Sequence, residues 1–388
     1  MNRKRTKSQR GIKIPIAVVI IVSALPAVMT ALFYALRSNA GLMDRVSIKI
    51  SSPVRGFMGM LSSIYPFSLM EVLCAAAFVW LLYYIIKTIV VMSRRQRKLN
   101  ILARRLMTVI VLALYVWSLS CWLWNSGYFA PGFAEKNGLI SGGVSASDLA
   151  KASRLFAGKA NELAPQVKRD KDGRFIEDRR DYLPESAEVY SNIAKQYPGL
   201  AGKLYPPKPM LFSWLMSRTG YTGVYFALTG ESNINVNAPG ALLPATIAHE
   251  LAHQNGIYAE DEANFIGIAA CVSSERVIYE YSGYLSGLIY LQNALYNADR
   301  DAWAEINGSL ASEVLQDWRE NSEYWQAQKT VHTGNGFIDR MLTSVIRKLS
   351  DSVDTVYDGY LKSNNQALGL KSYGACVDLL VEYFVVRQ

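Results

Sequence analysis

Three long runs of apolar residues occupy the first third of the chain. Residues 14–36 contain no charged side chain, residues 72–92 are interrupted only by Lys87 close to one end, and residues 106–128 carry no charge. A helix of about 20 apolar residues is long enough to cross the hydrocarbon core of a bilayer. Lys87 is tolerated there because a long side chain near a helix end can reach the interface. The pattern predicts a multi-pass membrane anchor of three spanning helices within residues 1–128. Aromatic residues gather at the far end of the third run, as they do at membrane interfaces: Trp117, Trp122, Trp124 and Tyr128.

From residue 129 to residue 388 the pattern is that of a water-exposed, mostly helical domain, because charged residues alternate with apolar ones at helical spacing. The predicted helices are 147–163, 184–196, 244–255, 261–274, 275–297, 301–328 with a break near Asn307, 337–365 and 372–386. Residues 223–237 differ, because an apolar run and a turn are followed by Asn233, Asn235 and Asn237 in alternation with Ile234 and Val236. This period of two predicts a small β-hairpin or sheet. We therefore expect an α+β domain dominated by helices.

Charge assigns a side of the membrane to each part. Six basic residues precede the first run and six more lie within residues 94–105, whereas the loop between the first two runs holds, beyond Arg37 at the end of the first run, only Arg45, Lys49 and Arg55. Because cytoplasmic segments carry the excess of Lys and Arg, we expect a cytoplasmic N-terminus and an extracytoplasmic domain after residue 128. The first run is longer than a usual signal-peptide core and lacks a clear cleavage site, which favours an uncleaved anchor.

The net charge of +9 has the same origin. Without those twelve residues, 29 basic residues stand against 32 acidic ones, so the positive charge reports topology and does not indicate nucleic-acid binding. The charged fraction of 19% is below the roughly 25% of soluble domains, as a membrane region requires. Four cysteines are too few for a disulfide scaffold.

One motif carries chemistry, the segment His249-Glu250-Leu251-Ala252-His253. Two histidines four residues apart lie on one face of a helix and can hold one zinc ion. The acid between them is then placed to take a proton from water at the metal. The chain has only three histidines, so this HExxH arrangement stands out from its composition. We expect His249 and His253 to be zinc ligands and Glu250 to be the general base.

A hydrolytic zinc site normally takes three protein ligands, and the third must come from elsewhere. The segment that starts the next predicted helix offers two acids, Glu260 and Glu262, of which Glu260 is the first choice and Glu262 the alternative. Asn264 lies one turn after Glu260, where it can hydrogen-bond a ligand histidine and fix its tautomer. Small residues on the same face of that helix permit close approach to the zinc-binding helix: Ala263, Gly267 and Cys271.

These motifs resemble known families. The Glu-x-x-Ala-Asn pattern after the HExxH segment resembles the Glu-x-x-Ala-Asp pattern of gluzincin metallopeptidases, in which the first Glu is the third zinc ligand. More closely, the chain resembles the bacterial membrane family called domain of unknown function 3810, and the segments that carry this resemblance are residues 220–231, 249–256, 262–265, 360–366 and 369–374. The resemblance implies a zincin-like, zinc-binding peptidase domain on a membrane anchor.

Weaker candidates complete the site. The polar strand with Asn233, Asn235 and Asn237 is a candidate edge of the substrate cleft, where an extended peptide could pair with its backbone. An ordinary solvent-facing hairpin is an equally good interpretation of the same pattern. A group that polarises the scissile carbonyl would come from His332, Tyr360 or Tyr373. Cys271 and Cys376 are expected to be separate buried thiols, with pairing as the alternative.

Together these observations predict a membrane-anchored, extracytoplasmic zinc metallopeptidase whose partners are a peptide or protein substrate and the lipid bilayer. The alternative is a membrane receptor or assembly protein in which zinc is purely structural. The two differ in whether Glu250 has a task, because a structural zinc site needs no general base.

Overall fold

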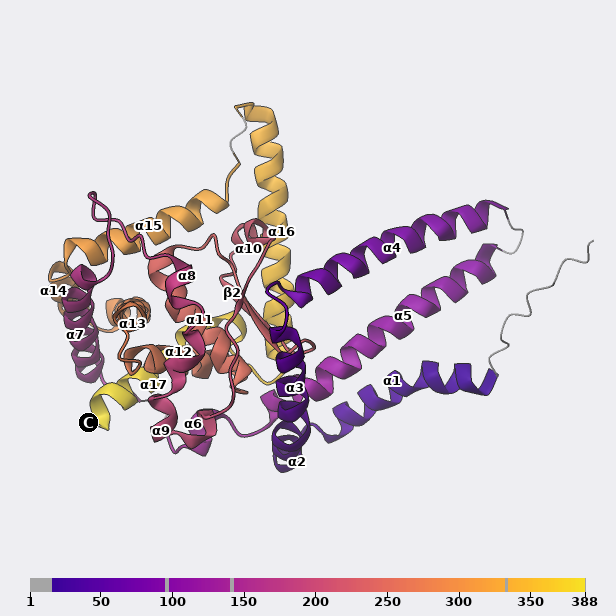
Figure 1. Ribbon diagram of the computed structural model, residues 1–388, viewed down its shortest axis with the longest axis horizontal. Helices are drawn as coiled ribbons and strands as arrows, with labels where there is room; N and C mark the ends of the chain where they lie inside the picture. Colours follow the sequence, from indigo (N-terminus) through magenta and orange to yellow (C-terminus); the bar gives the residue numbers. More distant parts are fainter. Residues whose placement is uncertain (1–15, 95–97, 140–142, 332–333, 388) are drawn as a thin grey trace, which may run out of the picture.

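A computed structural model of the chain describes residues 16–94, 98–139, 143–331 and 334–387. It places three apolar helices on one side of a mostly helical domain (Figure 1): α1 (Ile16–Leu36), α4 (Leu69–Arg94) and α5 (Lys98–Leu123). Of the described helices, α4 and α5 are long and apolar enough to cross a membrane, and the apolar part of α1 is shorter. Only 6% and 11% of the residues in the apolar windows of α4 and α5 are buried, so these are not core helices of the domain.

Short helices join α1 to α4 along the boundary between the apolar helices and the domain (Figure 1). They are α2 (Ala40–Val46), the π-helical turn Ser47–Ser51 and α3 (Ser52–Ser63). Buried charges fasten this boundary. Glu71 of α4 accepts hydrogen bonds from the backbone N–H groups of residues 211 and 212, and Lys208 lies 3.0 Å from Glu231 while it donates to the carbonyl of Ser62. The apolar helices are thereby attached to the domain at several points.

The core of the domain surrounds α13 (Val277–Ala298). The helices that pack against it include α7 (Ala146–Leu163), α11 (Leu243–Gln254), α12 (Glu260–Val272) and α17 (Cys376–Val381). Gly287 allows α7 to approach, because a Cβ atom there would lie 2.3 Å from the ring of Phe156. The remaining described helices are α6 (Phe133–Lys136), α8 (Arg179–Tyr182), α9 (Ile193–Gln196), α10 (Ser213–Thr219), α14 (Arg300–Gly308), α15 (Ser312–Gln328) and α16 (Gly336–Ser363).

The sheet has three short strands in the order β1-β3-β2. They are β1 (Lys208–Pro209), β2 (Gly223–Phe226) and β3 (Glu231–Ile234). Strand β2 pairs antiparallel with β3, Gly223 opposite Ile234, and β1 pairs parallel with β3 on its other side. The central position of β3 leaves β2 as an edge strand beside α11.

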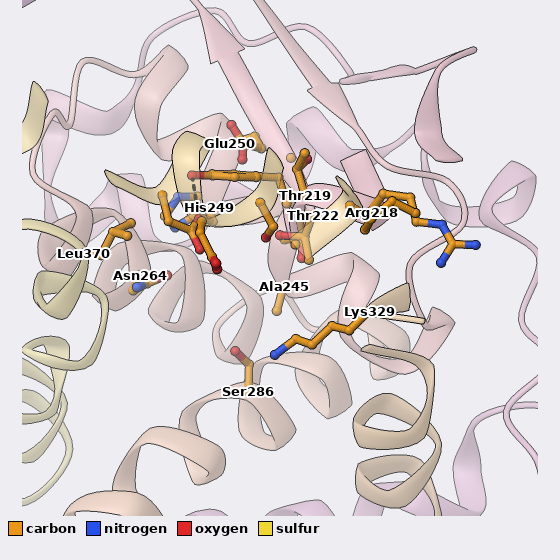
Figure 2. A pocket seen from close by; sticks show the side chains of 18 of the residues that line it. Arg218, Thr219, Thr222, Ala245, His249, Glu250, Asn264, Ser286, Lys329 and Leu370 are labelled. Atoms are coloured by element: carbon orange, nitrogen blue, oxygen red, sulfur yellow. Dashed lines mark hydrogen bonds between the residues drawn. The ribbon is translucent and has the colours of Figure 1, made fainter. Parts of the chain in front are cut away.

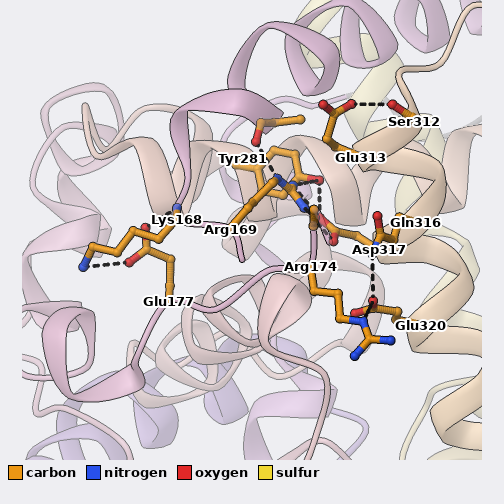
Figure 3. A network of polar contacts seen from close by, with 12 residues as sticks. Lys168, Arg169, Arg174, Glu177, Tyr281, Ser312, Glu313, Gln316, Asp317 and Glu320 are labelled. Atoms are coloured by element: carbon orange, nitrogen blue, oxygen red, sulfur yellow. Dashed lines mark hydrogen bonds and ion pairs between the residues drawn. The ribbon is translucent and has the colours of Figure 1, made fainter. Parts of the chain in front are cut away.

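A buried ion pair fastens the turn-rich segment before α8 to α13 and α15 (Figure 3). Two nitrogens of Arg169 donate to the carboxylate of Asp317 at 3.0 and 2.8 Å, and the hydroxyl of Tyr281 donates to the same carboxylate at 2.5 Å. Asp317 is fully buried and Arg169 is 10% exposed, so the charges are withdrawn from water together.

Several sequence predictions need correction. Residues 184–196 form a 3₁₀ turn and the short α9 in place of one helix, and α17 begins only at Cys376. The third apolar helix ends at Leu123, and the next residues form a 3₁₀ turn whose aromatic side chains pack into the domain. Tyr128 is buried and Trp124 contacts Tyr225 and Tyr258, so these two residues do not form a lipid-facing belt. The break predicted near Asn307 is confirmed between α14 and α15, and Cys271 and Cys376 are separate buried thiols.

Candidate metal centre

The two histidines of the motif lie on one face of α11. Pro244 occupies the first turn of this helix, where its missing N–H is tolerated, and Gly256 follows the helix end with a φ of +89°. The rings of His249 and His253 have centroids 4.7 Å apart. Local sequence therefore determines both the length of the helix and the common direction of the two imidazoles.

Glu260, the first residue of α12, completes a cluster of three candidate ligands. Its Oε2 atom lies 3.3 Å from Nε2 of His249 and 3.4 Å from Nε2 of His253. One ligand atom from each residue lies within 4.8 Å of the other two. The close crossing of α11 and α12 depends on Gly267, because a Cβ atom there would lie 2.8 Å from the backbone nitrogen of His249.

Neighbouring groups orient these ligands. Nδ1 of His253 hydrogen-bonds the carbonyl of Ile257 at 2.7 Å, which directs Nε2 toward Glu260. The hydroxyl of Tyr357 donates to Oε1 of Glu260 at 2.7 Å and so leaves Oε2 turned to the imidazoles. Such outer contacts are typical of metal sites because they fix tautomer and rotamer before the ion binds.

The charges of the cluster favour a cation. Burial raises the pKa of Glu260, but the two imidazoles more than offset this and hold the pKa of that carboxyl well below its usual range. Burial lowers the pKa of His253, and the Glu260 carboxylate outweighs it, so the pKa rises to about 9. In the part of the chain that the structure describes, Oε2 of Glu260 is buried without a hydrogen-bond partner. Two imidazole nitrogens and one carboxylate are also the donor set of hydrolytic zinc sites, so these residues fit a zinc ion.

Glu250 stands beside the cluster without belonging to it. Its carboxylate packs against β2, where a Cβ atom on Gly223 would lie 2.4 Å from Oε1, so a larger residue at this position would displace the Glu250 side chain. Burial raises the pKa of Glu250 to about 7. Its Oε2 atom is buried and has no hydrogen-bond partner among the described residues. A carboxylate with this pKa and a vacant acceptor atom is suited to general-base work.

Two cavities border the cluster. A polar cleft of about 620 Å³ has His249, Glu250 and Asn264 on one side and Lys329 and Arg218 on another (Figure 2). A second cavity of about 570 Å³ touches all three candidate ligands and Glu250. Its other walls are mainly apolar side chains, among them Met70 of α4 and Trp117 of α5.

The alternative ligand Glu262 lies elsewhere. Its two carboxylate oxygens accept hydrogen bonds from the N–H groups of Phe133 and Ala134, both at 2.8 Å, at the start of α6. Asn264 is buried and lines the polar cleft beside His249. The structure thus brings Glu260, and not Glu262, to the histidines.

The candidate electrophiles have different positions. Tyr360 lines the apolar cavity, and its hydroxyl donates to Asn125 at 2.6 Å. Tyr373 belongs to the 3₁₀ turn Gly369–Gly374, and its side chain is not among those described. His332 lies outside the described residues. Of the three, Tyr360 is the one whose place beside the centre is described.

The polar strand is not a cleft edge. Strand β3 is central, and its backbone pairs with β1 and β2 on its two sides, so an added peptide has no free edge there. Asn233 and Asn235 are fully buried and bond within the protein, the latter to Ser217 and to the carbonyl of Tyr221, while Asn237 is exposed beyond the strand. The free edge beside the centre belongs to β2.

Aromatic residues and one arginine around the centre were not identified from the sequence. The Arg55 guanidinium lies 5.2 Å from the ring of Trp124 and donates to the hydroxyl of Tyr258 at 2.7 Å. Trp124 packs edge-on against His253, with centroids 5.7 Å apart. These residues come from α3, the end of α5 and the loop after α11, so no spacing in the sequence connects them. Nothing in the sequence distinguishes Arg55 from Arg45 and Lys49 of the same loop.

Comparison with known proteins places the chain in a family without assigning an activity. No match was found among curated proteins or among solved structures. A family model described as "Protein of unknown function (DUF3810)" matches residues 47–381, which include α3 to α17 and the whole candidate metal centre. The chain therefore belongs to this family of unknown function.

Proposed function

We propose that this protein is a membrane-anchored zinc metallopeptidase that hydrolyses peptide bonds on the extracytoplasmic side. The observation that carries the proposal is the convergence of His249, His253 and Glu260 next to Glu250, a buried carboxylate outside the ligand set. A structural zinc site has no use for such a group, whereas hydrolysis requires one.

Each residue of the centre has a separate role in the proposed hydrolysis. His249, His253 and Glu260 would hold zinc, which when bound supplies a Lewis acid that polarises the scissile carbonyl and makes nearby water more acidic. Glu250 takes the proton of the attacking water on its carboxylate and delivers it to the amine that leaves. Its pKa of about 7 makes both steps accessible near neutral pH. Edge strand β2 offers its backbone to an extended substrate, and Gly223 keeps that strand close to Glu250.

The membrane arrangement is part of the proposal. The start of α1, the end of α4 at Arg94 and the start of α5 at Lys98 all lie at the end of the apolar helices remote from the domain (Figure 1). The twelve basic residues of the N-terminal tail and residues 94–105 belong to these same parts of the chain. Three spans with this end in the cytoplasm put the metal centre outside, close to the membrane surface.

Metal analysis and peptide cleavage by the purified full-length protein test the proposal. We expect one zinc per chain, its loss in His249→Ala and His253→Ala, and cleavage of members of a peptide library by wild type. Glu250→Gln should keep the zinc and lose roughly 10²–10⁴-fold in rate, because only the general base is removed. Unchanged cleavage by zinc-loaded Glu250→Gln protein refutes the mechanism. Zinc binding without cleavage of any peptide favours the structural-zinc alternative.

A further inference from the structure

The apolar cavity connects the candidate metal centre to the membrane-facing helices. On one side it touches His249, Glu250, His253 and Glu260. On the other it is bounded by Met70 in the first turn of α4 and by Trp117 and Ser120 near the end of α5. These are the ends of α4 and α5 that meet the domain, where the surface of the bilayer lies if these helices span it.

Exposed apolar side chains from two other elements lie at this boundary. The segment that enters α10 is attached to α4 through Glu71 and exposes Leu211, Phe212 and Trp214, of which Leu211 is 79% exposed. Exposed apolar patches of this kind mark contacts with a protein or a membrane. Because the segment is tied to the first turn of α4, the bilayer is its immediate neighbour.

Helix α16 carries an apolar stripe that leads into the same cavity. Met341, Val345 and Leu349 are exposed at helical spacing, and Val353 and Tyr360 continue the stripe as cavity walls. Other residues of α16 line the polar cleft: Ile346, Arg347, Ser350, Asp351 and Asp354. In Figure 1 the axis of α16 runs at a steep angle to the axes of α4 and α5, which is the orientation of a helix that lies on a membrane surface when α4 and α5 cross the membrane.

The two cavities meet at the catalytic groups. Both border Tyr221, Gly223, His249 and Glu250, so a chain along β2 would have one part in the apolar cavity and the other in the polar cleft. The cavity on the membrane side has few polar groups to satisfy a hydrophilic peptide, whereas apolar side chains gain by leaving water there. The site is therefore asymmetric, with an apolar half next to the bilayer and a polar half next to water.

We propose that the substrate is a polypeptide anchored in the same bilayer, cut where its apolar membrane segment emerges. This inference rests on the proposed peptidase function and specifies its substrate class. The apolar residues beside the cut occupy the cavity between α4, α5 and α16, and the water-exposed part of the substrate leaves through the polar cleft.

A pair of anchored peptides in vesicles tests the inference with the full-length protein. Both contain a sequence cleaved in the library assay and a Leu/Ala membrane helix of about 20 residues. In one peptide the helix adjoins the cut, and in the other a Gly/Ser linker of about 20 residues separates them, which keeps the peptide on the vesicle but removes apolar residues from the cut. We expect the adjoining peptide to be cleaved about 10-fold faster or more.

A substitution in the cavity wall supplies the second arm. Leu228→Glu puts a charge in the apolar cavity and should abolish the difference between the two peptides, whereas Ile176→Glu, an exposed apolar position outside the cavity, should preserve it. Equal cleavage of both peptides by wild type, or an undiminished difference in Leu228→Glu, overturns the inference and leaves the peptidase proposal standing. Cleavage of neither peptide and of no library member overturns the peptidase proposal and this inference with it.

Discussion

Arg169→Met is expected to destabilise the domain strongly, because it leaves the buried carboxylate of Asp317 without its positively charged partner. Asp317 is fully buried, and Arg169 supplies two of its three hydrogen bonds (Figure 3). The same side chain also bonds the carbonyls of Ala164 and Gly173, which hold the turn-rich segment in place. Removal of one partner of a buried ion pair costs about 3–5 kcal/mol. At about 2–4 °C per kcal/mol for a domain of this size, Tm should fall by about 6–20 °C.

Thermal unfolding of the full-length protein in detergent, followed by circular dichroism, measures this loss. Arg174→Met is the matched control, because Arg174 is 63% exposed and its nearest acid, Glu320, lies 3.6 Å away on the surface. Exposed pairs of this kind contribute little, so the control should melt like wild type. The double variant Arg169→Met with Asp317→Leu should recover part of the loss, since it removes the stranded charge. A wild-type Tm for Arg169→Met, or a double variant less stable than either single one, refutes the reasoning.

Three further outcomes are expected. Glu260→Gln should lower zinc affinity by roughly 10-fold or more, as measured by competition with a chelator. Glu262→Gln should change it little, because the Glu262 carboxylate bonds the start of α6, and the reverse order of effects would make Glu262 the ligand. Gly223→Ala should keep zinc but reduce peptide cleavage by about 100-fold, because the new Cβ displaces Glu250. Gly158→Ala, whose Cβ meets open space, should cleave peptides at the wild-type rate, and equal rates for the two variants would contradict the proposed role of Glu250. A reporter fused to the C-terminus should be active only outside the cytoplasm, and cytoplasmic activity would reverse the topology.

Helix length and spacing made much of this molecule predictable. The apolar runs correspond to α1, α4 and α5, and the spacing of His249 and His253 puts both rings on one face of a helix whatever that helix packs against. The small residue Gly267 also predicted the close crossing of α11 and α12. These properties depend on residues within a few turns of one another, so the sequence carries them directly.

The third candidate ligand was a question of tertiary packing. Residues 260 and 262 are separated by about 200° around a helix, so the same sequence pattern allows either acid to face the histidines, but not both. The crossing at Gly267 turns Glu260 to the imidazoles and sends Glu262 to the N–H groups that begin α6. Tyr357, which orients Glu260, lies 97 residues further along the chain.

The sheet and the cavities of the site show the same division between local sequence and tertiary packing. Alternation of Asn233 and Asn235 with apolar residues indicated a strand. Only the tertiary structure shows that this strand is paired on both sides, so that β2 has the free edge. Periodicity reports which residues share a face, because it is a property of one element. Which element covers that face, and which cavity it borders, depends on contacts between distant segments, and only the tertiary structure decides them.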